Sequence, residues 1–340
     1  MPFNQHIIDN PKSERVKRVA ELEKTKGRKK AGKFLIEGPQ SVREVVRWMP
    51  EVVEDCYVQM DERQSGLLSP VVEDIAREAD ERGLYIHQVT VDVMHRMSTD
   101  AQGIVAVGNL ETVQNRMVKD FEHGQSSDER DTKVIHNVAT RGTVVRSNAE
   151  GADDSSVAYQ SSESKPVSVS PNDTVAAFWQ IRDPGNAGTV IRSADAAGCR
   201  AVIFVDDCVD RFNPKVIRST AGSLFHLPVV RMNTDEFFAW AREQNHEVMA
   251  ADVYGTEKIK PESLIDVVKK YQNSEAYGKN KDYSQTILFG NEARGLPNDV
   301  LERVQRIVSI PLYGKAESLN LATSTAVMLF TLAMNGHYSR

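Results

Sequence analysis

Apolar and polar residues follow one another in blocks over two stretches of the chain, and these blocks predict alternating strands and helices. The alternation favours an α/β fold. In the first stretch the predicted strands are 34–38, 52–58, 84–89 and 103–107, and the predicted helices are 39–48, 70–82 and 91–97. In the second stretch the predicted strands are 175–181, 201–205, 247–251, 286–289 and 307–310, and the predicted helices are 187–197, 213–222, 234–244, 297–304 and a last long helix from Ser318.

The strand at 175–181 and the helix after it form the unit around which the prediction is built. The strand leads into the turn Pro184-Gly185, and Asn186 is placed to cap a helix that Gly198 ends. Ligands of open parallel sheets lie at the carboxyl ends of the strands. We therefore expect Asn186 and Arg192 to border one pocket near the start of this helix.

The stretch from about 111 to 170 has a different character. Serine clusters lie among acidic and small residues, and hydrophobic periodicity is poor. Such a segment is typical of a linker or a disordered region, although residues 134–145 could carry a strand or two. We therefore predict a first domain at 1–110, a largely polar linker or insertion at 111–172, and a second domain at 173–340.

The overall charge does not favour a nucleic-acid partner, but one segment does. The 340 residues carry a net charge of −6, so nucleic acid would have to meet a local basic patch. Residues 24–30 read KTKGRKK. They form either a solvated surface turn or a loop whose closely spaced cations contact phosphates. On the second interpretation, the RNA-binding residues are Lys26, Arg28, Lys29, Lys30 and Lys33.

Cysteine and histidine usage points to a reducing compartment and no metal. Cys56, Cys199 and Cys208 have no paired spacing, and the eight histidines form no ligand cluster, so we expect a cytoplasmic protein without disulfides or metal. The N-terminus has no apolar signal core. Polar residues interrupt the apolar stretch at 319–334, which favours a buried helix over a membrane span.

Three loops follow predicted strands in the second stretch, at 183–192, 290–297 and 311–320, and each combines glycine with Asn, Ser, Glu or Arg. Glycine lets backbone groups approach a ligand closely, which suits an adenine or a ribose held by main-chain hydrogen bonds. The chain lacks a complete G-x-G-x-x-G, a P-loop and a G-x-S-x-G elbow. A Rossmann dehydrogenase, a P-loop NTPase and a standard serine hydrolase are therefore disfavoured.

In order and spacing, the three loops resemble the signature motifs of the SpoU/TrmH branch of the SPOUT RNA methyltransferases. The matches are N-x-G-x-x-x-R at 186–192, G-N-E-x-x-G-L at 290–296 and I-P-x-x-G-x-x-x-S-L-N at 310–320. Leu312 departs mildly from the family, where methionine is common at this position. The segment GKFLIEGP at 32–39 resembles the substrate-binding domain of the same family, which is similar to small RNA-binding ribosomal proteins.

The resemblance implies a fold, a cofactor and an assembly. The fold is an α/β, parallel-sheet SPOUT methyltransferase domain with a trefoil knot, preceded by a smaller N-terminal α/β RNA-binding domain. The knot, in which the chain after Phe289 threads a loop, rests on the resemblance alone, because the general rule is against knots. The methyl donor is S-adenosyl-L-methionine, and family members are typically homodimers whose active sites are completed at the dimer interface.

The resemblance also assigns residues. The main chain of three residues holds the donor, where backbone groups at strand and helix ends are free. These cofactor-binding residues are Gly290, Ile310 and Leu319. The implied catalytic residues are Arg192, Asn186, Glu292, Ser318 and Asn320.

Every assigned side chain also has a structural interpretation. Arg192 could pair with Asp195, three residues further along the helix, and Asn186 could be only a helix cap. Glu292 could accept backbone N–H bonds and fix the second loop, or it could be an exposed turn carboxylate. Ser318 and Asn320 could cap the last helix. Ile310 and Leu319 could be core residues even if their main chain binds the donor.

The implied reaction is methyl transfer from S-adenosyl-L-methionine to an RNA ribose 2′-hydroxyl. An additional N-terminal domain resembles the rRNA enzymes of the family more than the compact tRNA enzymes, so 23S (large-subunit) rRNA is the predicted substrate. One alternative is a tRNA 2′-O-methyltransferase. Another is a non-catalytic RNA-binding assembly factor, which the intact motif residues disfavour.

Overall fold

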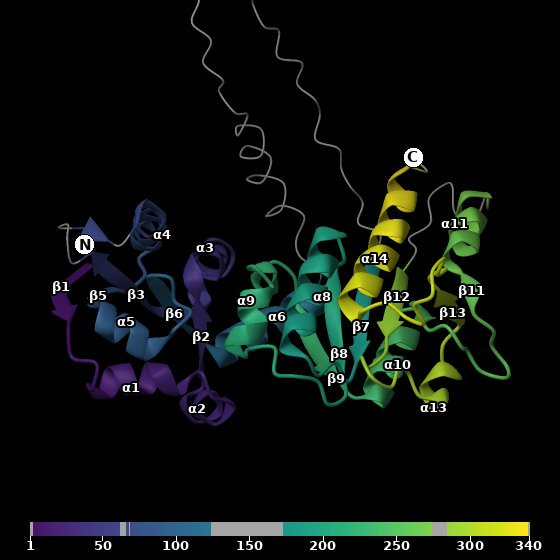
Figure 1. The fold of residues 1–340 in the computed structure, drawn as a ribbon, viewed down its shortest axis with the longest axis horizontal. Helices are drawn as coiled ribbons and strands as arrows, with labels where there is room; N and C mark the ends of the chain where they lie inside the picture. Colours follow the sequence, from purple (N-terminus) through teal and green to yellow (C-terminus); the bar gives the residue numbers. More distant parts are fainter. Residues whose placement is uncertain (1–2, 62–65, 68, 124–172, 274–283, 339–340) are drawn as a thin grey trace, which may run out of the picture.

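The computed structural model describes residues 3–61, 66–67, 69–123, 173–273 and 284–338. Two β-sheets lie side by side along the long axis of the molecule, with helices between them (Figure 1). The first sheet is built from the N-terminal third of the chain and the second from residues after 172. The two sheets differ in strand direction.

The first sheet is mixed, with the strand order β1-β5-β3-β6-β2 and a short β4 beside β3. Strands β1, β5 and β3 are parallel, whereas β6 is antiparallel to both β3 and β2. The strands are β1 Phe3–Ile8, β2 Lys33–Glu37, β3 Val53–Asp61, β4 Gly66–Leu67, β5 Ile86–Val89 and β6 Ile104–Asn109. The α-helices of this half are α1 Glu14–Glu21, α2 Thr25–Ala31, α3 Gly38–Trp48, α4 Pro70–Glu81, α5 Val91–Met97 and α6 Leu110–His123.

The second sheet has seven strands, all parallel, in the order β11-β13-β10-β12-β7-β8-β9. All their carboxyl ends therefore meet at one edge. The strands are β7 Asp173–Trp179, β8 Ala201–Val205, β9 Val229–Met232, β10 Glu247–Ala251, β11 Glu262–Ser263, β12 Ser284–Phe289 and β13 Arg306–Ser309. The α-helices are α8 Pro184–Ala196, α9 Pro214–Ser219, α10 Thr234–Glu243, α11 Leu264–Asn273, α13 Asn298–Leu301 and α14 Leu321–Tyr338.

Both faces of the parallel sheet are buried. Along β8, Val202 and Phe204 pack in one apolar cluster, whereas Ala201, Ile203 and Val205 pack in a second cluster on the opposite face. A parallel strand covered on both sides needs a continuous apolar run, because successive side chains point to opposite faces. This explains why apolar runs located the strands correctly from the sequence. The predicted parallel-sheet α/β architecture is confirmed, and the knot stays a prediction.

Several elements differ from the sequence prediction. The basic segment expected to be a turn or loop forms α2, and α6 occupies the start of the segment assigned to the linker. Residues 124–172, with the possible strand at 134–145, lie outside the described residues. Elements that the sequence did not predict include β1, α1 and β9 and the two-residue strands β4 and β11. The three proposed domain boundaries stay a prediction.

One predicted helix cap and one predicted helix start were also wrong. Asp183 caps α8, because its Oδ1 accepts from the backbone N–H of Asn186 at 2.7 Å. The last helix begins at Leu321 rather than at Ser318, and Asn320 Oδ1 accepts from the backbone N–H of Ala322 at 2.9 Å. The cap of α8 lies three residues before Asn186, whereas Asn320 is one of the two residues that the sequence offered as a cap for the last helix, and that alternative is confirmed. Several polar residues compete for one helix start.

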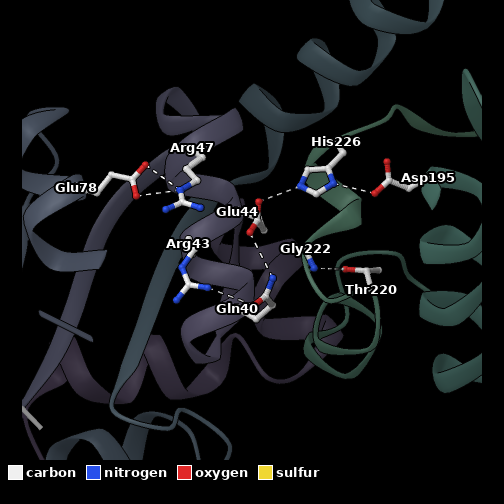
Figure 2. A network of polar contacts seen from close by, with 9 residues as sticks. All are labelled: Gln40, Arg43, Glu44, Arg47, Glu78, Asp195, Thr220, Gly222 and His226. Carbon is white, nitrogen blue, oxygen red and sulfur yellow. Dashed lines mark hydrogen bonds and ion pairs between the residues drawn. The ribbon is translucent and has the colours of Figure 1, made fainter. Parts of the chain in front are cut away.

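Several polar contacts join the two halves of the molecule. Arg28 of α2 binds Asp210, and Arg218 of α9 binds Glu37 at the end of β2. His226 lies between Glu44 of α3 and Asp195 of α8 (Figure 2). The rings of Phe34 and Phe212 also meet across the halves, with their centroids 4.9 Å apart. The first sheet is therefore held against the parallel-sheet half by packing and by charge.

Candidate active site

A cavity of about 410 Å³ opens at the carboxyl edge of the parallel sheet. Three chain segments line it, and they follow the adjacent strands β10, β12 and β13. Two of these segments are the second and third loops predicted from the sequence. The remaining segment that lines the cavity is residues 251–255, which the sequence analysis did not indicate. The cavity lies where an open parallel sheet holds its ligand.

The loop after β12 folds back on itself tightly. The backbones of Asn291 and Gly295 exchange two hydrogen bonds, of 3.1 and 2.9 Å. A Cβ atom on Gly290 would overlap Gly295 and would lie only 2.7 Å from the nitrogen of Leu296. Only glycine therefore fits at position 290, and the main chain of this turn faces the cavity without a side chain in front of it.

Asn291 holds this turn in place. Its side chain is buried, and its Nδ2 donates to the carbonyl oxygen of Gln180 at the end of β7, at 2.7 Å. Its Oδ1 accepts from the backbone N–H groups of Ala293 and Arg294. The motif G-N-E contains this asparagine, yet the sequence analysis assigned it no role. The local signal for its turn role is an asparagine directly after glycine, because asparagine side chains bond backbone groups two to three residues further on.

The loop after β13 supplies the opposite wall. Ile310, Ser318 and Leu319 line the cavity, as does Leu312. Ile310 and Leu319 are half-buried. The alternative that these two are core residues is therefore only partly correct. Asp252, which the sequence did not single out, also lines the cavity, and its Oδ1 accepts from the backbone of Tyr254 and Gly255.

The first loop joins the other two through side chains. Glu292 accepts from the backbone N–H groups of Arg182 and Asp183, at 3.4 and 3.3 Å, and from Asn186 Nδ2 at 3.4 Å. Asn320 Nδ2 donates to Asn186 Oδ1 at 3.2 Å. Glu292 thus accepts backbone N–H groups, but those of the first loop and not of its own. The three predicted loops converge on one place.

Arg192 lies apart from this junction. It follows Asn186 by six residues on α8, which is about 9 Å along the helix axis. It is exposed, it does not line the cavity, and its guanidinium has no hydrogen-bond or ion-pair partner among the described residues. Its predicted pairing with Asp195 is wrong, because Asp195 accepts from His226 at 2.8 Å. Within one chain, the structure does not bring Arg192 to the cavity.

The basic segment around α2 divides into buried and exposed positions. Lys26, Lys29 and Lys30 are exposed, and Lys33 pairs with Glu54 at 2.5 Å. Arg28 is only 1% exposed, and its guanidinium is occupied by Asp210 and by backbone carbonyls. The prediction that Arg28 contacts RNA is therefore wrong for this conformation, because the side chain faces the protein interior.

The cysteines carry no obvious chemistry. Cys56, Cys199 and Cys208 are buried free thiols, and burial raises the pKa of the first two to about 12 and that of Cys208 to about 11. Among the described residues, no group of three or more His, Cys, Asp or Glu side chains is arranged to hold a metal ion. No helix in the described part of the chain has the length and apolarity to span a membrane.

The parallel sheet, with its cavity at the carboxyl edge, gives this molecule an α/β fold of the SPOUT class, which it shares with solved SpoU methyltransferase structures. Residues 173–330 match the family model described as the SpoU rRNA Methylase family. Residues 13–106 match the model described as the MRM3-like substrate binding domain. Residues 173–330 therefore carry a SpoU rRNA methylase domain, and the resemblance read from the motifs is confirmed for this part of the chain.

Individual relatives agree with this assignment. Over 153 residues the chain is 37% identical to a 23S rRNA (guanosine(2553)-2′-O)-methyltransferase from Bacillus subtilis. The aligned region covers 45% of this chain and 54% of the relative. It is 33% identical over 156 residues to a 23S rRNA (uridine(2479)-2′-O)-methyltransferase from Streptomyces viridochromogenes, covering 45% and 50%. The chain thus spans about half the length of the curated relatives it matches.

A solved structure extends the similarity over almost the whole chain. The AdoMet-bound rRNA methyltransferase from Sinorhizobium meliloti superposes with a TM-score of 0.62 and 25% sequence identity, covering 97% of both chains. The likeness therefore includes the first half of the molecule as well as the parallel sheet.

Proposed function

We propose that this protein is an enzyme that transfers a methyl group from S-adenosyl-L-methionine to a ribose 2′-hydroxyl of 23S rRNA. The observation that carries the proposal is the convergence of three glycine-containing loops around one cavity. Its walls are main chain from the ends of adjacent parallel strands. The relatives named above carry the same activity in their descriptions.

The cavity fits the donor by its shape and chemistry. The turn at Gly290 exposes backbone groups that can hydrogen-bond an adenine, and Ile310 and Leu319 add main chain from the opposite wall. Half-buried leucines and Asp252 place apolar and acidic surface in one pocket. That combination suits a nucleoside with a cationic sulfonium. The bound donor supplies an activated methyl group, and the protein aligns it.

The residues of this chain then act on the acceptor. Glu292, Asn186 and Asn320 fix the first loop against the cavity, and Ser318 lines the cavity. An in-line displacement from a good leaving group depends mainly on such alignment. Arg192 is a poor base because the pKa of arginine exceeds about 12. We assign it to stabilising the developing oxyanion or to holding the adjacent phosphate.

We further propose that the active unit is a homodimer. Arg192 is exposed and lies outside its own cavity, so a second subunit can receive it. The C-terminal helix α14 also exposes two large apolar side chains, Val327 and Met334. Exposed apolar surface on a helix next to the site suits a subunit interface.

We propose the first half, residues 1–110, as the RNA-binding domain and the cytoplasm as the site of action. Lys26, Lys29 and Lys30 on α2 supply cations for the phosphate backbone. Mapping 2′-O-methyl sites in total RNA from cells with and without the gene tests the substrate. A site lost only from 23S rRNA supports the proposal, whereas a site lost only from tRNA selects the tRNA alternative.

Substituting Gly290 tests the cofactor site directly. Gly290→Ala should abolish measurable binding of S-adenosyl-L-methionine in calorimetry, because the new Cβ overlaps the folded-back turn. Gly66→Ala is the control, since a Cβ there has open space in β4 of the first sheet, outside the cavity, and should leave binding unchanged. Equal binding by both variants would contradict the assigned cavity.

Calorimetry with S-adenosyl-L-methionine also distinguishes the enzyme from the non-catalytic RNA-binding assembly factor. If the wild-type chain shows no heat of binding with millimolar S-adenosyl-L-methionine while it still binds RNA, the assembly-factor interpretation holds. Binding that is lost only in Gly290→Ala supports the enzyme.

A further inference from the structure

The loop that joins β8 to α9, residues 206–213, contains a buried arginine that is not ion-paired with a described carboxylate. Arg211 is 8% exposed, and no hydrogen bond or ion pair joins its guanidinium to another described residue. Its Nε is buried without a partner, whereas the two terminal nitrogens are not sealed from solvent. The Cζ atom lies 4.9 Å from the ring centroid of Phe212, which orients the guanidinium plane.

Every carboxylate of this loop is already occupied. Asp210 Oδ2 accepts from Arg28 at 3.0 and 2.6 Å, and its Oδ1 accepts from the backbone of Phe212. Asp207 pairs with Arg182 at 2.8 Å. Asp206 accepts from Trp179 and Thr234. The charge of Asp210 therefore still favours protonated Arg211, but no carboxylate of this loop hydrogen-bonds the guanidinium.

The neighbourhood adds positive charge. Burial, together with the nearby charge of Arg231, lowers the pKa of Arg211 to about 10, so it stays protonated at neutral pH. Arg231 is exposed, and its Nη2 donates only to the carbonyl oxygen of Asp206. Helix α2, with its exposed lysines, is attached to the same loop through Arg28 and Asp210. A protonated, buried and unpaired guanidinium is costly to a protein unless an anion binds it.

The position of the loop indicates which anion. It follows β8, which is two strands away from β12 in the sheet order, and strands lie about 4.8 Å apart. Arg211 thus lies on the same carboxyl edge as the cofactor cavity, about 10 Å further along by strand count. An RNA strand with its ribose at the cavity would pass over this edge toward α2.

We propose that Arg211 and Arg231 form a phosphate-binding subsite for the RNA substrate, in which the planar guanidinium of Arg211 grips one phosphodiester of the strand beside the methylated nucleotide. The fork of Nη groups matches two phosphate oxygens. This inference rests on the proposed RNA methyltransferase function, and nothing in the three signature motifs includes either arginine.

The test is a salt titration of RNA binding by Arg211→Met. The probe is a short fluorescein-labelled single-stranded RNA of mixed sequence, measured by anisotropy without cofactor. We expect affinity to fall about tenfold, as for loss of one charge-assisted contact. The slope of log affinity against log salt should fall by about 0.7, as for one phosphate contact to a single strand. The variant should melt no earlier than the wild type, because it removes an unpaired buried charge.

Two further variants make the result specific. Arg303→Met is the matched control, because Arg303 also stacks on a phenylalanine, at 4.2 Å, but is paired with Asp235. It should bind RNA as the wild type does. Arg211→Lys keeps the charge without the planar fork, and should retain the salt slope while losing part of the affinity.

Unchanged RNA affinity and salt slope in Arg211→Met would overturn the proposal. So would a calorimetric titration in which inorganic phosphate binds through Arg211 while RNA affinity does not change, since the subsite would then take free phosphate. Calorimetry with S-adenosyl-L-methionine reports separately on the proposed function. If S-adenosyl-L-methionine does not bind, the proposed function fails, but the RNA-binding measurement can still be interpreted. Arg211→Met should bind S-adenosyl-L-methionine as the wild type does.

Discussion

At the scale of single residues, His226 is the most strongly perturbed histidine of the molecule among those described. Burial would lower the pKa of its imidazole, but hydrogen bonds to Asp195 and Glu44 outweigh burial and raise the pKa to about 9. The protonated ring donates from both nitrogens, at 2.8 Å to Asp195 and at 3.2 Å to Glu44 (Figure 2). The ring also lies against Trp48 of α3. Protonation at this one residue therefore links the two halves.

This linkage predicts a pH-dependent stability. The pKa of an unfolded histidine is about 6.5, so the stabilisation is complete below that pH and is lost as pH rises through about 9. Urea unfolding of the wild type and of His226→Gln should differ by on the order of 2 kcal/mol near pH 6, and the difference should shrink toward pH 10. His95→Gln, at an exposed histidine of α5, is the control and should show a difference that does not change with pH. A constant difference for His226→Gln would contradict the protonated bridge.

The candidate site shows a second lesson at this scale. The motif residues Asn186, Glu292 and Asn320 were predicted from the sequence, and the structure joins them by hydrogen bonds. Asn291 and Asp252 were missed, because their roles depend on where the turns fold. A side chain that binds backbone three residues away can be predicted from local spacing. One that binds the carbonyl of Gln180, 111 positions away, cannot.

At the scale of elements, α8 carries the first motif and packs closely on α9. A Cβ on Gly188 would overlap Ser219 Oγ and would lie 2.6 Å from the carbonyl oxygen of Val216. The glycine of the N-x-G motif therefore permits helix packing and does not face a ligand. The sequence is the same whether the glycine of this motif binds a ligand or permits helix packing. Only the structure distinguishes these two roles.

Gly188→Ala should therefore destabilise the fold by about 1–3 kcal/mol, because the backbone of α9 must move to admit the methyl group. Chemical unfolding measures this directly. Thr189→Ala, at the neighbouring exposed position of the same helix, should change stability by less than about 0.5 kcal/mol. A Gly188→Ala variant as stable as the wild type would show that α8 and α9 separate easily.

Among the elements, the basic helix α2 was the least accurately predicted. Glycine and the run of lysines suggested a turn, whereas α2 is a seven-residue helix with Gly32 in the left-handed conformation just after it. Its stability comes from Arg28, which reaches into the protein and binds Asp210. Because short helices depend on tertiary packing, propensity alone underestimates them.

At the scale of the whole molecule, the proposed homodimer can be tested by complementation. If Arg192 acts in the cavity of the partner subunit, mixing inactive Arg192→Ala with inactive Gly290→Ala should restore activity. In each mixed dimer, the intact cavity of the Arg192→Ala subunit receives the intact arginine of its partner. Random mixing makes half of the dimers mixed, with one working site each, so about a quarter of wild-type activity should return.

The control is each variant mixed with itself, which should stay inactive. Light scattering coupled to size exclusion gives the assembly state independently. A mixture as inactive as its parents, from a protein shown to be dimeric and to exchange subunits, would place Arg192 in its own cavity. A monomeric active enzyme would exclude the dimer altogether.

By itself, the sequence determined the parallel-sheet class, most strand positions and two of the three segments that line the cavity. The reason is that a strand buried on both faces must be a continuous apolar run, and that a backbone-binding turn needs glycine at set positions. The tertiary structure alone decided the strand order, the burial of Arg28 and the isolation of Arg211. These depend on partners that are distant in sequence, such as Asp210, which is 182 positions from Arg28. A local sequence pattern does not show which distant charged residue a side chain will contact in the folded protein.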